Sequence, residues 1–218
     1  MRLVALVHLR REPSPARLAD LEAVVAGLPD EVSAVRRVHL GKHLPGCVGG
    51  GHYTLDALVD GGDANAVLGA PSLRDLVDAG DVVERLDPVA FEPQHVSIAE
   101  PAIENCVKRT LFLRVFPETP ADVVEEFERV IMAMPDHIDA IRNWACSRTD
   151  PTAVPTSWTH VWEQEYADKS GLEVDYMMHP YHWGLVDGWF DPECPQRIVD
   201  LVVAHVYCPA AETILGWK

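Results

Sequence analysis

Two kinds of apolar spacing alternate along the first hundred residues. Residues 2–9 are rich in Val and Leu and predict a β-strand. A helix is expected next, because the Ser14-Pro15 pair suits a helix start and apolar residues then recur at helical spacing as far as Leu28. The same criteria predict, in chain order, strands at 32–40 and 53–59, a broken helix at 63–78 and a strand at 82–91.

The pattern then restarts in the second half. The expected elements are a strand at 107–116, a helix opened by Thr119-Pro120, strands at 137–146 and 158–166, a helix at 169–178 and a strand at 197–207. Individual residues also recur: Leu28-Pro29-Asp30 returns as Met134-Pro135-Asp136, a shift of 106 positions (135 − 29). This agreement favours a tandem duplication over a chance likeness of two unrelated halves.

The repeat predicts an α+β protein with two domains, 1–98 and 106–218, connected by a linker at 92–105. Each β-α-β-β-α-β copy forms a four-stranded antiparallel sheet with helices on one face, a ferredoxin-like half. The other face of each sheet is apolar and needs a cover. The two sheets are therefore expected to pack face to face.

Composition limits the function classes. The formal net charge of −16 argues against nucleic acid and anionic membrane partners, which require clustered Lys and Arg. The 5 cysteines are scattered, without a Cys-x-x-Cys pair, which argues against a disulfide framework or a structural zinc site. Residues 1–11 lack the pattern of a signal peptide, and no apolar run reaches the length of a membrane span, so a cytoplasmic location is expected.

Candidate chemistry gathers in the second half. The segment Asp175-Tyr176-Met177-Met178-His179-Pro180-Tyr181-His182-Trp183 places phenols and two imidazoles among aromatic rings, and the strand Ser157-Trp158-Thr159-His160-Val161-Trp162 adds a third imidazole. Imidazoles titrate near neutral pH, so such side chains can move protons or bind a metal.

These two segments resemble the stress-responsive A/B barrel family of the dimeric α+β barrel superfamily. Within that family the second half, from Val107-Lys108 to Tyr207-Cys208-Pro209, is most similar to plant polyketide cyclases of the olivetolic acid cyclase type. The resemblance implies that the two halves form one intramolecular α+β barrel. It also implies that His160, Tyr176 and His182 are catalytic, and Trp158, Trp162, His179 and Trp183 are expected to bind substrate.

The first half lacks this set of residues. A shift of 106 places Thr54 opposite His160, and matching Ala70-Pro71 to His179-Pro180 places Val67 and Leu73 opposite Tyr176 and His182. One site per chain is therefore expected. The first half would replace the second subunit of homodimeric relatives, although a homodimer of the whole chain stays open.

The expected function is cofactor-independent acid–base chemistry, as a cyclase, isomerase or lyase, on a small aromatic or polyketide-like carbonyl compound. A non-catalytic stress-related or small-molecule-binding barrel is the alternative, with His160 as a hydrogen-bonded core residue. A metal site of His160, His179 and His182 is disfavoured, because Pro180 interrupts the helix between the last two. His39, His43 and His52 are expected in loops, and His205 in strand packing.

Strand alternation gives a geometric expectation. Trp158, His160, Trp162 and Gln164 should share one face of their strand. If His160 is catalytic, this face is turned towards Tyr176 and His182, and the three side chains converge on one small molecule.

Overall fold

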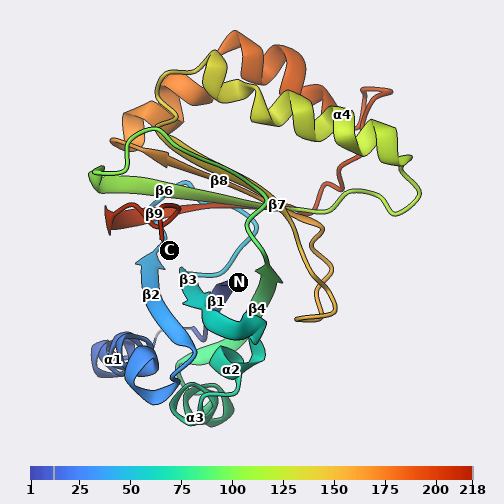
Figure 1. The fold of residues 1–218 in the computed structure, drawn as a ribbon. Helices are drawn as coiled ribbons and strands as arrows, with labels where there is room; N and C mark the ends of the chain where they lie inside the picture. The colour runs from blue at the N-terminus through green and yellow to red at the C-terminus, as the bar shows by residue number, and fades with distance from the viewer. Residues whose placement is uncertain (12, 218) are drawn as a thin grey trace.

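The computed structural model describes residues 1–11 and 13–217, which form two antiparallel sheets lying face to face, each covered on its outer side by helices (Figure 1). The elements of the first half are β1 (Arg2–Leu9), α1 (Pro15–Glu31), β2 (Val35–Lys42), β3 (Tyr53–Val59), η1 (Asp60–Gly62), α2 (Asn65–Leu68), α3 (Pro71–Ala79) and β4 (Val83–Phe91). Those of the second half are β5 (His95–Ile98), β6 (Glu104–Leu113), α4 (Ala121–Met132), η2 (Met134–Asp136), β7 (Asn143–Arg148), β8 (His160–Tyr166), η3 (Gly171–Tyr176), η4 (His182–Val186), η5 (Asp187–Trp189) and β9 (Ala204–Glu212).

Both sheets have the same strand order relative to their own chain segments. The first runs β2-β3-β1-β4, and the second runs β7-β8-β6-β9 with β5 added beside β7. All strand pairs are antiparallel. The mixed helix-and-sheet architecture of two antiparallel sheets is confirmed, and its strand order is that of ferredoxin-like halves.

Local sequence explains most element boundaries. The side chain of Ser14 accepts a hydrogen bond from the backbone N–H of Arg17, and Pro15 begins α1, as the sequence predicts. Several boundaries differ from expectation. The last strand was expected at 197–207, whereas β9 begins at Ala204 and ends at Glu212. The chain turns after η2 instead of extending, so β7 begins at Asn143. The segment expected to be the linker contains β5, which pairs with β7.

The inner faces of the two sheets pack directly on each other. Their apolar contact consists of Val4, Leu6, Val89 and Phe91 from the first sheet with Phe112, Trp158, Val161, Ala204 and Val206 from the second half. The loop between β2 and β3 extends this contact, because Leu44 N donates to Tyr207 O, and Val48 and His205 exchange backbone hydrogen bonds.

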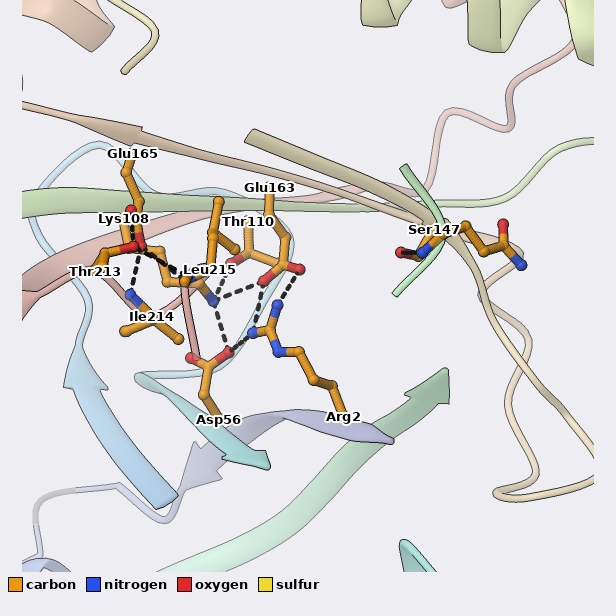
Figure 2. Close-up of polar contacts among 12 residues, drawn as sticks. Arg2, Asp56, Lys108, Thr110, Ser147, Glu163, Glu165, Thr213, Ile214 and Leu215 are labelled. Carbon is orange, nitrogen blue, oxygen red and sulfur yellow. Dashed lines mark hydrogen bonds and ion pairs between the residues drawn. The ribbon is translucent and has the colours of Figure 1, made fainter. Parts of the chain in front are cut away.

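A buried ionic network crosses the same interface. Figure 2 shows Arg2 and Asp56 reaching from β1 and β3 towards Lys108 and Glu163 of the second sheet. Arg2 Nη1 donates to Glu163 Oε2 at 2.6 Å, and Lys108 Nζ donates to Asp56 Oδ1 at 2.7 Å. All four side chains are buried. The two cations thus face two carboxylates, which compensates the cost of removing them from water.

No helix within residues 1–11 and 13–217 combines the length and apolar character needed to cross a membrane.

Candidate functional site

A cavity of about 150 Å³ lies on the outer side of the second sheet, beneath the helical turns η3 to η5. Side chains from three neighbouring strands form its floor. Strand pairing places Trp162 of β8 and His205 of β9 on either side of Leu111 in β6. Arg109 lies two residues from Leu111 on the same face. An apolar cavity of this volume holds about one six-membered ring.

Tyr176 and His182 form the wall opposite this floor. Both line the cavity, and their ring centroids are 4.6 Å apart. Tyr176 ends η3 and His182 begins η4, so the break at Pro180 is what turns the second ring back beside the first. The structure therefore brings together two of the three predicted catalytic side chains.

The electrostatics of the cavity keep its aromatic acids and bases neutral. Burial, together with the smaller effect of the charge of Arg109, lowers the pKa of His182 to about 4. Burial, with contributions from Arg109 and His182, lowers the pKa of His205 to about 3. Burial raises the pKa of Tyr176. At neutral pH both imidazoles are proton acceptors, and the phenol retains its proton.

The Tyr176 hydroxyl faces hydrogen-bond donors. The N–H groups of Trp162 and Gln164 and the charge of Arg109 all oppose the rise in the pKa of Tyr176. Neither N–H reaches hydrogen-bond geometry, and Trp162 Nε1 and Gln164 Nε2 have no partner among residues 1–11 and 13–217. This surrounding would stabilise negative charge on oxygen, which is what a reaction through an enolate requires.

Arg109 is a buried cation without a carboxylate partner in the described part of the chain. Its Nη1 donates to Gln164 Oε1 at 2.7 Å, and its guanidinium carbon lies 5.1 Å from the centroid of the Tyr176 ring. Its Nε has no partner in the same residues. Buried charges in proteins are normally paired, so this arrangement makes the cavity a candidate binding site.

His160 lies on the expected sheet face but outside the cavity. Its Nε2 is 3.0 Å from Glu128 Oε1, and its Nδ1 is 2.8 Å from the hydroxyl of its neighbour Thr159. Burial raises the pKa of Glu128, but hydrogen bonds from Arg148 and His160 outweigh it and bring the pKa to about 2. Both nitrogens of His160 are engaged, and the expected convergence of three side chains is wrong in this respect.

The predicted substrate-binding residues divide in the same way. Trp162 lines the cavity. Trp158 precedes β8, packs between the sheets and donates from Nε1 to Asp87, so its expected place on the face of His160 is wrong. Trp183 is 59% exposed. His179 accepts the backbone N–H of Tyr181, a local turn contact.

The metal reading finds no support in the geometry, since no group of three or more His, Cys, Asp or Glu side chains within the described residues is arranged to hold a metal ion. His182 contacts Asp187 at 3.5 Å instead, and that carboxylate lies exposed at the cavity mouth.

The corresponding space of the first half is filled. Leu3 of β1 takes the position of Arg109 in β6, a shift of 106 (109 − 3). Their partners in the neighbouring strands are Ala57 of β3 and Gln164 of β8. β3 and β8 therefore correspond with a shift of 107 (164 − 57), one more than the sequence repeat suggested. Tyr53, not Thr54, is thus the counterpart of His160. A shift of one residue exchanges sheet faces, and Thr54 lies on the opposite face, where its hydroxyl contacts His43 Nε2. The helix-side residues Leu3, Leu55, Ala57, Val67 and Leu73 are buried in one apolar cluster.

Two cavity residues were missed by sequence reasoning. Arg109 interrupts an otherwise apolar face of β6 made of Val107, Leu111 and Leu113, and a charge at such a position was a usable signal. His205 was assigned to packing, although the structure gives its Nε2 no partner within the described residues.

Residues 107–203 match the model of the Stress responsive A/B Barrel Domain. Comparison with curated protein sequences finds no match. Among solved structures, an anthrone oxidase-like protein is similar with a TM-score of 0.64 at 13% identity, covering 100% of this chain and 94% of the other. A candidate monooxygenase from Fusobacterium nucleatum subsp. nucleatum has a TM-score of 0.61 at 10% identity, covering 98% and 94%. One from Lactobacillus acidophilus has 0.54 at 11%, covering 97% of both chains. At these identities the similarity shows the fold. The second half of the chain thus carries the family match and the cavity.

Proposed function

We propose that this protein is a cofactor-independent enzyme that performs acid–base chemistry on a small aromatic carbonyl compound. The observation that supports it is the contact between Tyr176 and His182 in the wall of a largely apolar cavity. A cavity of about 150 Å³ suits a single ring better than a polyketide with a long alkyl chain. Isomerase or lyase chemistry is therefore favoured over the full polyketide cyclase reaction.

In the proposed reaction, His182 takes a proton from the carbon beside the carbonyl group. The C–H bond breaks and its electron pair forms the C=C bond of an enolate. The Tyr176 hydroxyl donates a hydrogen bond to the enolate oxygen, and Arg109 offsets the developing negative charge. Return of the proton to another atom completes an isomerisation, and loss of a group from the adjacent carbon completes a lyase reaction.

Two structural parts of the proposal go with this chemistry. The two sheets and the β2–β3 loop close a single intramolecular α+β barrel, supported by the backbone hydrogen bond between Leu44 and Tyr207. The first half, with its filled apolar cluster, acts as the structural partner of the second half. The chain then needs no second copy to complete its cavity.

The experiment is proton exchange in D2O. Small aryl ketones are incubated with the protein, and the loss of the α-proton signal is followed by ¹H NMR. Enzyme-dependent exchange that disappears in Tyr176→Phe supports the proposal, whereas equal exchange in both proteins contradicts it. An oxygen electrode run on the same mixtures detects oxygenation, the activity named for the structural neighbours.

A non-catalytic small-molecule binder is the second candidate. The pKa of His182, lowered to about 4, favours it, because a base this weak removes carbon-bound protons slowly. Ligand binding without any proton exchange across the ketone panel would select this candidate.

A further inference from the structure

We propose that the ligand of this cavity carries a carboxylate, which pairs with Arg109. This inference deepens the proposed function by naming a substrate class, a small aromatic or enolisable carboxylic acid. A buried charge without an ionic partner is energetically costly. Arg109 is only 3% exposed and has no carboxylate within ion-pair distance among the described residues.

The groups around Arg109 do not compensate its charge. From β8 it receives the neutral amide of Gln164, and from η3 the face of the Tyr176 ring. His182 and His205 lie close enough for Arg109 to lower their pKa values, so both stay uncharged. Asp187, whose side chain is 52% exposed at the mouth, contacts His182 rather than Arg109. Arg109 is therefore the buried charge among the residues that line the cavity, and an anion inside the cavity would pair with it.

Arg109 supplies N–H donors for the anion, and His205 adds one when its neutral ring carries the proton on Nε2. Arg109 Nε and His205 Nε2 have no hydrogen-bond partner within residues 1–11 and 13–217, and both residues line the cavity. Arginine binds carboxylates through its planar set of N–H groups, often with two parallel hydrogen bonds. Leu111, Leu113, Ile131 and Met134 supply the apolar surface for a ring or a short chain.

Anion binding also increases the basicity of His182, the proposed base. The positive charge of Arg109 is one cause of the lowered pKa of His182. A carboxylate that pairs with Arg109 offsets this charge and raises the pKa of the imidazole. A substrate with the right charge thus strengthens the base that acts on it, and a neutral analogue does not.

The test compares benzoate with benzamide, which share size and ring but differ in charge. Isothermal titration of the full-length protein should show benzoate binding at least tenfold more tightly. Arg109→Gln should weaken benzoate binding roughly ten- to a hundredfold, the usual contribution of a charge-assisted hydrogen bond, and change benzamide binding little. Arg142→Gln is the matched control, because Arg142 is half-exposed and away from the cavity.

Equal affinity for the two ligands, failure of benzoate to bind, or equal weakening of both by Arg109→Gln overturns the proposal. If Arg109→Gln does not fold, Arg109→Lys and the melting temperature of the unaltered protein replace it. Benzoate, and not benzamide, should then raise that temperature. The outcome is separable from the proposed function. Arg109-dependent benzoate binding without proton exchange retains this inference alone. Tyr176-dependent exchange of neutral ketones, with benzoate and benzamide bound equally, retains the enzyme alone.

Discussion

Lys108 and Arg109 are neighbours in β6, are both buried and point to opposite faces of the sheet. Lys108 faces the first half, where its Nζ contacts Asp56 at 2.7 Å and Glu163 at 3.0 Å. Arg109 faces the helices, where it contacts an amide and a phenol ring. The comparison separates two uses of a buried charge. The charge of Lys108 joins the two sheets through ion pairs, whereas Arg109 keeps an N–H group without a partner in the described residues and can bind a ligand.

The two halves differ in the same sense. In the first half, the counterpart of Arg109 is Leu3 and the counterpart of Trp162 is Leu55, and both are fully buried in an apolar cluster. The same strand order thus supports a filled core on one side and a cavity on the other. The difference includes two corresponding strand positions, where Arg109 and Trp162 of the second half stand in place of Leu3 and Leu55.

The largest expected effect comes from the paired charge. Lys108→Met should lower the free energy of unfolding by about 3–5 kcal/mol, because it leaves the carboxylates of Asp56 and Glu163 buried with only Arg2 to compensate them. Urea denaturation followed by circular dichroism measures this. Arg109→Gln is the matched control and should change stability by less than about 1 kcal/mol, because it breaks no ion pair. Similar losses in both variants would remove the distinction between the two faces.

The next effect concerns turnover. Tyr176→Phe and His182→Gln should each reduce proton exchange about a hundredfold or more, the range of general acid–base contributions, with little change in melting temperature. Trp183→Phe and His179→Gln are matched controls in the same segment, because neither residue lines the cavity. A variant that unfolds would instead show that its side chain holds the core together.

Stability should also depend on pH through the cavity histidine. The pKa of His182 is about 4 in the folded protein, below its ordinary value of 6.5, so the folded state binds fewer protons than the unfolded chain between these values. Its contribution is present above about pH 6.5 and is lost as the pH falls towards 4. His182→Gln should therefore lose less stability than the unaltered protein between pH 7 and 4. Thermal melts across this range test it, with exposed His95→Gln expected to leave the slope unchanged.

The fold was largely predictable because its signals are local. Apolar periodicity and the Ser14-Pro15 start located α1, and the limits of β1 and β3 match the prediction. The repeat predicted two sheets in contact. The predictions that failed concern strand pairing and register, which depend on contacts between segments far apart in the sequence. Strand β5 exists through its pairing with β7, and the correspondence of Thr54 with His160 was off by one residue, which inverts the sheet face.

The candidate site was predictable in part for the same reason. Alternation correctly placed His160, Trp162 and Gln164 on the helix side, but failed at Trp158, which precedes the regular strand. His160 shares a sheet face with Trp162 but does not line the cavity, because it lies at the first position of β8, two residues before Trp162. The importance of Arg109 comes from the lack, among the described residues, of a carboxylate within ion-pair distance, which only the packed chain reveals.

The smallest expected effect tests whether His160 belongs to the site. His160→Gln should cost about 1 kcal/mol of stability, since it removes the hydrogen bond to Glu128 while Arg148 still pairs with that carboxylate. Proton exchange and benzoate affinity should stay within about twofold of the unaltered protein, because Phe127 packs against the His160 ring and neither lines the cavity. Exchange and affinity must be measured beside stability, because stability is expected to fall whether or not His160 is catalytic. Glu128→Gln is the matched control, because it alters the same contact from the helix side; it should lose more stability, since it also removes the ion pair with Arg148, and leave exchange unchanged. A hundredfold loss of exchange in His160→Gln, with normal exchange in Glu128→Gln, would return His160 to the catalytic set and require its ring to leave Glu128 when substrate binds.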